Sequence, residues 1–301
     1  MIRDAYGENY MDRYFFVLNP VAGRGSARLY KKTIEKYEKT LGLEYEIVET
    51  EFPGHGETLS AEACKRGFDN IVSVGGDGSL LEVINGVVGE DVSVGIIPCG
   101  TGNDFSRTLG LPEELNEQLK VIHRGKKKRV DLGNANGKYF INVFSFGIDA
   151  LITQETQKIK KYLPGTFAYV AATIKMLMTY RPVQIHMETD EIIFDGKVML
   201  VAFGNGQYYG GGMKITPEAS LDSGDFQVCI VRALSKTRFL RLFPKVFKGK
   251  HIELMEVETS RAKKIKVESK DRILLNADGD IVGECPVEIG IFPGAIQIKV
   301  P

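Results

Sequence analysis

Three glycine-rich turns in the first half of the chain carry groups that are suited to holding phosphate. They read NPVAGRGS at residues 19–26, GGDGS at 75–79 and PCGTGNDF at 98–105. Glycine lets a backbone approach a ligand that a Cβ would block, and a helix beginning at such a turn presents free N–H groups to an anion. Each turn taken alone also fits a plain strand-to-helix connection. The three together favour a site for the phosphates of a nucleotide.

Asp77 stands between two glycines of the second turn. A carboxylate beside phosphate is unfavourable unless a cation bridges the two, and Mg²⁺ prefers such oxygen ligands. The alternative is that Asp77 only caps the helix that follows. The first turn lacks the Gly-Lys-Ser/Thr of a Walker motif, whereas Thr101 in the third turn offers a further hydroxyl.

Two more carboxylates, Asp278 and Asp280, flank Gly279 after an apolar run in the second half. At this spacing both can project from one turn. A carboxylate can accept the proton of an alcohol that attacks a γ-phosphate. A plain Asp-Gly hairpin turn is the alternative, and these residues alone favour it.

The first half alternates short apolar runs with helical stretches, which predicts the elements that position the three turns. Strands are expected at 14–18, 44–48, 71–74 and 92–97, and helices at 26–41, 57–66 and 80–88. Continuous apolar strands alternating with helices are typical of a parallel sheet covered on both faces. The ends of such strands share one edge, where ligands bind.

From about residue 137 the pattern changes to short strands separated by turns. Strands are expected at 139–146, 183–187, 198–204, 226–231, 265–267, 273–275, 287–291 and 296–300. This predicts a mainly antiparallel β domain with helical insertions near 150–180 and 234–248. The predicted domains are residues 1–135 and 136–301. The pattern does not decide whether the last strand returns to the first domain.

Composition excludes several classes of protein. The 301 residues include 39 Lys+Arg and 39 Asp+Glu, so no global positive field favours a nucleic-acid partner. The four cysteines lie far apart, which argues against a disulfide framework or a zinc site. The longest apolar-rich run, 167–180, is shorter than a membrane span and contains Lys175. No signal segment is visible, and a cytoplasmic protein is expected.

In this order the three turns resemble the catalytic domain of the diacylglycerol kinase family, and in particular its bacterial soluble lipid kinases. The resemblance rests on NPVAGxG from residue 19, GGDGSLxEVxNG from residue 75 and PxGTGNDFxR from residue 98. It extends through roughly residues 14–294. It implies ATP bound between an α/β domain, similar to those of NAD kinases and phosphofructokinases, and a β-sandwich domain. It also implies transfer of the γ-phosphate to a lipid hydroxyl, first of all from diacylglycerol to phosphatidate.

The resemblance also implies roles for individual positions. The nucleotide site would be lined by Asn19, Pro20, Val21, Ala22, Gly23, Thr50, Gly76, Asp77, Gly78, Ser79, Leu80, Leu81, Glu82 and Thr101. Asp280 stands where the family has Glu and would accept the hydroxyl proton, with Asp278 as its rival or partner and Asp77 as a further catalytic residue. Because Asp280 is one methylene shorter than Glu, its reach is an open point.

The segment 217–226 resembles one that holds a structural Mg²⁺ in bacterial members. The implied ligands fall at Ser220, Ser223 and Asp225. Ser223 replaces the usual Asp, which weakens the prediction of a metal, and a simple β-turn is the alternative.

Other acceptors and other functions stay open at this point. The acceptor alternatives are phosphatidylglycerol, a sphingoid-like base and NAD. The changes at Ser223 and Asp280 also leave room for a non-catalytic regulator that binds nucleotide and membrane. The basic stretch 232–252, with interleaved aromatic residues, predicts peripheral contact with an anionic inner membrane face, where a lipid substrate lies. An amphipathic helix packed on its own domain is the alternative, and a homodimer through free β edges stays open.

Overall fold

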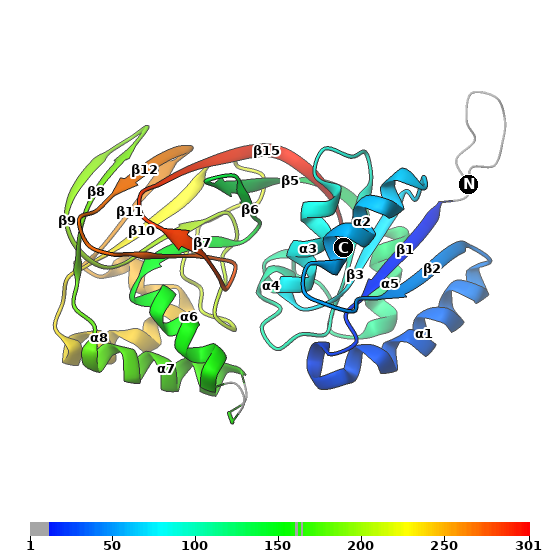
Figure 1. Ribbon diagram of the computed structural model, residues 1–301, viewed down its shortest axis with the longest axis horizontal. Helices are drawn as coiled ribbons and strands as arrows, with labels where there is room; N and C mark the ends of the chain where they lie inside the picture. The colour runs from blue at the N-terminus through cyan, green and yellow to red at the C-terminus, as the bar shows by residue number, and fades with distance from the viewer. Residues whose placement is uncertain (1–11, 160–161, 164) are drawn as a thin grey trace. The chain divides into compact units, whose positions relative to one another are not determined.

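The computed structural model describes residues 12–159, 162–163 and 165–301, which form two compact units (Figure 1). The first unit comprises the residues up to 130 together with 295–301, and the second comprises 131–294. Two of the described strands, β5 (Lys126–Ala135) and β15 (Val287–Val300), have residues in both units. The predicted boundary at residue 135 falls at the end of β5.

The first unit contains a parallel sheet in the order β2-β1-β3-β4-β15. Its own strands are β1 (Arg13–Leu18), β2 (Glu44–Glu49), β3 (Asn70–Gly75) and β4 (Ser93–Pro98). The C-terminal end of β15 completes the sheet, with Gln297 opposite Ser93. The last strand therefore does return to the first unit.

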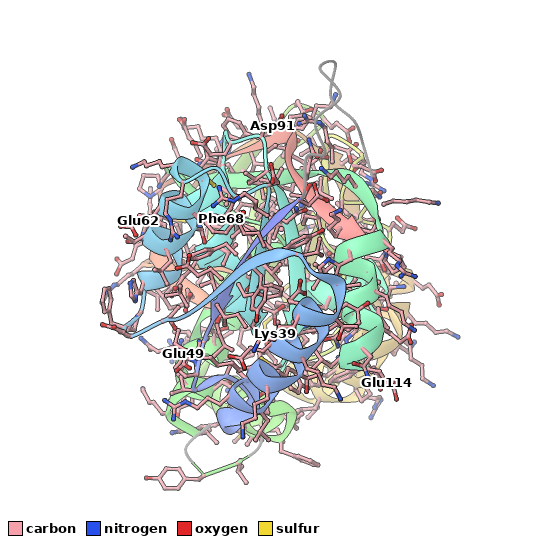
Figure 2. The ribbon with its side chains drawn as sticks, turned by 90° about the vertical axis from the view of Figure 1, so that its right-hand side faces the viewer. Lys39, Glu49, Glu62, Phe68, Asp91 and Glu114 are labelled. Carbon is pink, nitrogen blue, oxygen red and sulfur yellow. The ribbon has the colours of Figure 1, made fainter. Side chains whose placement is uncertain are left out.

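Helices cover both faces of this sheet. They are α1 (Ser26–Leu41), α2 (His55–Lys65), α3 (Asp77–Val87), α4 (Asp104–Leu109) and α5 (Leu115–Arg124), with a short 3₁₀ turn η1 (Ala22–Gly25) before α1. Tyr14 and Phe16 of β1 pack with α1 and α5, whereas Val17 faces α2, because side chains alternate along a strand. Figure 2 faces this unit and shows α1, with Lys39, and α2, with Glu62, on different sides of β1.

The second unit is built mainly from antiparallel strands. They are β6 (Lys138–Phe140), β7 (Val143–Gly147), β8 (Val183–Thr189), β9 (Ile193–Gly204), β10 (Phe226–Arg232), β11 (Val257–Ala262), β12 (Lys264–Glu268), β13 (Leu274–Ala277) and β14 (Asp280–Glu284). The helical segments are α6 (Ile148–Ile159), α7 (Gly165–Thr179), α8 (Lys236–Leu242), η2 (Phe243–Lys248) and η3 (Lys250–Glu253). The expected combination of an α/β part and an antiparallel β part is confirmed.

Two apolar cores lie on opposite faces of β9 and β10. Val201 and Phe203 point into a core made of strands alone, while Leu200 and Ala202 point into a core shared with α6, α7 and η2. This period of two is what a strand buried on both faces requires. Within the described part of the chain, no helix combines the length and apolarity needed to cross a bilayer.

Three predicted elements differ from the structure. The strand expected at 139–146 is two strands, because the backbone N–H groups of Ile141 and Asn142 donate to the Asp278 carboxylate. The two strands expected at 287–291 and 296–300 form one strand, β15.

Candidate active site

The three glycine-rich turns meet at one edge of the first unit's sheet. The turn after β1 contacts the turn after β3, because Asn19 Nδ2 donates to Ser79 Oγ at 2.9 Å. The turn after β3 contacts the turn after β4, because the Cys99 N–H donates to the Gly75 carbonyl at 2.9 Å. The structure therefore brings together the turns that the strand order predicted to share an edge.

Two of the glycines are required by the approach of one turn to another. Gly23 has φ +57°, and a Cβ there would lie 2.1 Å from the Cys99 carbonyl oxygen. At Gly100, a Cβ would lie 2.5 Å from the Gly76 Cα. Gly78 differs, since a Cβ there would meet nothing within 4 Å. Gly25 in the first turn has equally open surroundings, so Gly25 and Gly78 are the positions in these turns where a Cβ would meet no other atom.

The second turn leads directly into α3, whose N-cap is Gly76. The Leu80 N–H donates to the Gly76 carbonyl at 3.0 Å, which closes the first helical turn. The preceding N–H groups have no acceptor within the helix and carry its partial positive charge, so they suit phosphate. Leu80 itself is buried in the core and can offer a ligand only its backbone.

The Asp77 carboxylate joins the second turn to the third. It accepts hydrogen bonds from the Asp104 N–H at 3.2 Å and the Phe105 N–H at 3.1 Å, both at the start of α4. The alternative interpretation was that Asp77 caps the helix that follows it, which is α3. Asp77 does cap a helix, but that helix is α4. A carboxylate has about four lone-pair positions, so the half-buried Asp77 keeps capacity for a cation.

Glu82 and Thr50 position neighbouring parts of the same edge. The Glu82 carboxylate accepts the N–H groups of Gly54 and Gly56, at 2.8 and 2.9 Å, and so caps α2. The Thr50 N–H donates to the Leu18 carbonyl at 2.8 Å, which keeps the end of β2 beside the first turn. Both residues hold structure around the predicted nucleotide site.

The remaining predicted nucleotide residues lie on the surface of these turns. Val21 is 76% exposed, and its N–H donates to Asn19 Oδ1 at 3.1 Å. Thr101 is exposed in the third turn, whose shape is fixed by the Gly100 N–H donating to Asn103 Oδ1 at 3.0 Å. Three further residues are half-buried, namely Pro20, Ala22 and Leu81.

In the second unit, Asp278 and Gly279 form the two-residue turn between β13 and β14. Their φ angles are +50° and +96°, the combination of positive values that a type I′ hairpin requires. The hairpin interpretation and the acidic-turn interpretation are thus compatible. Asp280 is the first residue of β14 and is exposed.

The Asp278 carboxylate holds the backbone together. It accepts three N–H groups, from Ile141 at 2.7 Å, Asn142 at 3.0 Å and Val143 at 2.8 Å. The Asp278 carboxylate thus binds the backbone at the break between β6 and β7, whereas Asp280 is exposed at the start of β14.

A buried carboxylate that sequence reasoning missed is Asp149 at the start of α6. It is 1% exposed and accepts hydrogen bonds from Ser145 Oγ at 2.5 Å, from the Tyr169 hydroxyl at 2.5 Å and from Asn276 Nδ2 at 2.8 Å. Burial, and next the Asp149 charge, raise the pKa of Tyr169 well above its usual range. The available signal was a lone acid within the apolar run FSFGIDALI at 144–152.

Asp149 borders an apolar cavity inside the second unit. The cavity lies among α6, α7, α8, η2 and the helix-facing side of β9 and β10. Its walls are almost wholly aliphatic and aromatic side chains, among them Ile152, Leu200, Leu234, Phe239, Phe243 and Leu254. A concave apolar site with a few polar groups is the usual form of a pocket for an apolar ligand.

Ser220, Ser223 and Asp225, the implied metal ligands, do lie in one turn. The Ser223 hydroxyl contacts the carbonyl oxygens of Ser220 and Asp225, at 3.0 and 3.1 Å. The Ser223 side chain is thus the hydrogen-bond partner of both carbonyls. In the part of the chain that the structure describes, no group of three or more His, Cys, Asp or Glu residues is placed to hold a metal ion. The donor set does not fit Mg²⁺, because residue 223 supplies a neutral hydroxyl that bonds to both carbonyls and the Asp225 carboxylate is paired with Arg261.

Comparison with known proteins identifies both units. Residues 13–135 match the diacylglycerol kinase catalytic domain, and residues 142–300 match the YegS C-terminal NAD kinase beta sandwich-like domain. The diacylglycerol kinase of Bacillus subtilis (strain 168) is 32% identical over 97% of both chains. That of Mycobacterium tuberculosis (strain ATCC 25618 / H37Rv) is 33% identical over 94% of this chain and 93% of its own.

Solved structures agree with the sequence matches. A crystal structure of a proposed diacylglycerol kinase from Bacillus anthracis str. Sterne superposes with a TM-score of 0.82 at 25% identity, covering 98% of this chain and 99% of the other. The similarity therefore extends over both units.

Proposed function

Because the chain belongs to the diacylglycerol kinase family and is an ATP-dependent lipid kinase, we propose that its acceptor is diacylglycerol and its product phosphatidate. The observation that carries the choice of a lipid acceptor is the apolar cavity of the second unit. The site for ATP is supported by the meeting of the three glycine-rich turns at the N-terminus of α3. Residues from all three contribute backbone groups where the triphosphate of ATP is expected. Mg²⁺ bound with ATP, held on the protein side by Asp77, would neutralise charge on the phosphates.

The acid–base step is assigned to Asp280. Its exposed carboxylate accepts the proton of the lipid hydroxyl while that oxygen bonds to the γ-phosphorus. The bond from the γ-phosphorus to the β–γ bridging oxygen breaks, and ADP leaves. Asp278, whose carboxylate accepts three N–H groups, holds the turn that presents Asp280.

The apolar cavity of the second unit supports a lipid acceptor. Its walls suit an acyl chain, and the Asp149–Tyr169 pair supplies polar groups for the glycerol end of the lipid. NAD is a polar acceptor, so apolar walls would not stabilise its binding. A sphingoid-like base or phosphatidylglycerol would use the same cavity, so a panel of acceptors separates these lipids.

The direct test is transfer of label from radiolabelled ATP to diacylglycerol in mixed micelles, with phosphatidylglycerol and a sphingoid base in parallel. Labelled phosphatidate as the main product supports the proposal. Preferred labelling of another lipid, or label in none of them with the fold intact, contradicts it.

One substitution tests the cavity itself. Leu254 lines the cavity, and its neighbour Met255 is 85% exposed, so Leu254→Trp and Met255→Trp form a matched pair. The chain has no Trp, so each indole is the sole reporter of its own surroundings. Leu254→Trp should show blue-shifted emission and a kcat/KM for long-chain diacylglycerol lowered by about 10-fold or more, as for a lost apolar contact. Met255→Trp should do neither.

We also propose that α7 contacts the membrane surface that carries the lipid. Phe167, Ile174 and Met178 lie on one face of α7 and are 72%, 49% and 66% exposed. The basic helix α8 adjoins it, with the Lys236 ammonium donating to the Met178 carbonyl. Exposed apolar side chains beside basic ones match the acyl and anionic layers of a bilayer.

Sedimentation with vesicles of phosphatidylcholine, with and without phosphatidylglycerol, tests this contact. Ile174→Glu should abolish vesicle binding. Leu29→Glu, at a residue 75% exposed on α1, is the matched control and should bind normally. Equal binding by both variants would contradict the assignment to α7.

A further inference from the structure

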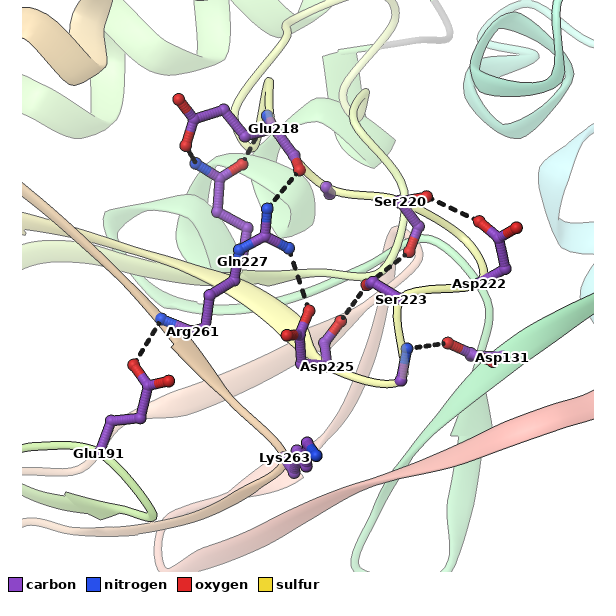
Figure 3. Close-up of polar contacts among 12 residues, drawn as sticks. Asp131, Glu191, Glu218, Ser220, Asp222, Ser223, Asp225, Gln227, Arg261 and Lys263 are labelled. Atoms are coloured by element: carbon purple, nitrogen blue, oxygen red, sulfur yellow. Dashed lines mark hydrogen bonds and ion pairs between the residues drawn. The ribbon is translucent and has the colours of Figure 1, made fainter.

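The turn at residues 217–226 is closed by its own side chains (Figure 3). The Ser223 hydroxyl lies 3.0 Å from the Ser220 carbonyl oxygen and 3.1 Å from that of Asp225, and shares its one proton between them. The Ser220 hydroxyl donates to Asp222 Oδ1 at 2.7 Å. These contacts draw together the backbone oxygens that a bound cation would otherwise gather.

A cation is already present at this turn, as the side chain of Arg261 on β11. Its Nη1 lies 3.0 Å from Asp225 Oδ1, and its Nη2 donates to the Glu218 carbonyl at 2.7 Å. Figure 3 shows the guanidinium between these two acceptors. The planar fork of arginine suits two acceptors at once. Arg261 therefore connects the beginning of the turn to its end and neutralises the Asp225 carboxylate.

The buried Asp131 fixes the turn to the rest of the second unit. It is 2% exposed, and its two oxygens accept the N–H groups of Gly224 and Gly294, each at 2.7 Å. Gln227, 1% exposed, adds a contact on the other side, because its Oε1 accepts the Glu218 N–H at 2.7 Å. Both ends of the turn are thus anchored by protein groups.

We infer that this turn needs no metal ion, because the Ser223 hydroxyl and the Arg261 guanidinium together do what a bound Mg²⁺ and a carboxylate ligand at residue 223 would do. Mg²⁺ demands about six oxygens near 2.1 Å in octahedral geometry and favours carboxylate ligands. Here position 223 offers a neutral hydroxyl, and Asp225 is paired with Arg261. The inference concerns the stability of the fold, so it stands independently of the acceptor proposed above.

Thermal unfolding of the full chain, without nucleotide, in EDTA and in excess Mg²⁺ tests the inference. The wild-type Tm should be the same in both. Ser223→Asp should lose the hydroxyl contacts and place a second carboxylate beside Asp225, lowering Tm in EDTA by about 3 °C. Mg²⁺ should restore that loss, because the variant now offers the missing ligand. Ser223→Asn is the matched control of similar size without charge, and its lowered Tm should not respond to Mg²⁺.

Titration with Mn²⁺, read by electron paramagnetic resonance, gives a second measurement. Ser223→Asp should bind one more ion than wild type. A wild-type Tm that falls in EDTA and recovers with Mg²⁺ would overturn the inference. So would a Ser223→Asp variant that ignores both ions, since the residue at position 223 would then not decide metal binding.

Discussion

The glycine turns of the first unit and the acidic turns of the second are both rich in Asp and Gly, yet they are built differently. In the first unit the three turns meet mainly through close backbone approach, which Gly23 and Gly100 allow, and the Asp77 carboxylate adds two hydrogen bonds to the start of α4. In the second unit, carboxylates such as Asp278 and Asp131 bind backbone N–H groups far away in the sequence. An acid beside glycine can therefore serve chemistry or hold the chain in place, and the groups that it contacts decide which.

Among these substitutions, Asp280→Asn should have the largest effect on activity. Loss of a proton acceptor lowers turnover by about 10²–10⁴-fold. Because Asp280 is exposed, the free energy of unfolding should change by less than about 0.5 kcal/mol. Steady-state kinetics and urea unfolding on the same preparation measure both quantities. Retained activity would remove Asp280 from the mechanism.

Gly100→Ala should lower the stability of the fold, because Gly100 allows two turns to pack together. Gly78→Ala should instead weaken the binding of ATP, because Gly78 leaves room for a ligand. A Cβ at Gly100 would collide with the Gly76 backbone, so we expect about 3 kcal/mol of destabilisation. Gly78 has open space and lies in the first turn of α3, so alanine there should leave stability unchanged or raise it by up to about 1 kcal/mol. Gly78→Ala should nevertheless raise the KM for ATP. Equal stability of the two variants would contradict the packing argument.

Asp278→Asn should lower the stability of the fold more than the activity of the folded enzyme. Asparagine tolerates the positive φ of this position, but its amide nitrogen cannot accept the N–H groups that the carboxylate holds. We expect about 1–3 kcal/mol of lost stability, measured by urea unfolding. Activity per folded molecule should fall far less than in Asp280→Asn, and the reverse order would exchange the two roles.

The smallest expected effect concerns His251, whose Nε2 donates to the Ile215 carbonyl. Burial lowers the pKa of His251 below its usual value. The unfolded chain therefore binds more protons than the folded one near and below about pH 6.5, so this stabilisation is complete above that pH and is lost as the pH falls.

His251→Gln separates the pH-dependent stabilisation due to His251 from that of other titrating groups. His186 titrates with the opposite sign, because hydrogen bonds to Glu188 and Asp195 raise its pKa. The difference in unfolding free energy between wild type and His251→Gln should therefore shrink from about pH 8 to about pH 5.5. A constant difference would show that His251 does not couple folding to protonation.

The sequence was most informative where local pattern decides structure. The helix at 26–41 was predicted at the bounds it has, and the three turns were expected to meet, because apolar strands and glycine punctuation are local signals. The roles of Asp77 and Asp278 were not accessible in this way. Asp77 binds the backbone at Asp104, and Asp278 binds Ile141, and no local pattern reports such distant partners.

The other features that the sequence did not predict also depend on contacts between residues far apart in the chain. The strand expected at 139–146 is interrupted by hydrogen bonds to Asp278, which lies more than a hundred residues away. Asp149 stood within an apolar run and carried no motif, so only its partners Tyr169 and Asn276 mark it as part of a polar network. Arg261 likewise becomes a feature of the turn at 217–226 only through the pairing of β10 with β11.

The return of β15 to the first unit has a consequence for biosynthesis. Ile296 and Ile298 are buried, and Gln297 and Ile298 lie opposite β4 in the parallel sheet. On the ribosome, where N-terminal domains ordinarily fold first, the sheet of the first unit keeps an open edge until all of residues 131–294 have been translated. A nascent chain stalled before that point would expose the unpaired edge of β4, which could then pair with a strand of another chain.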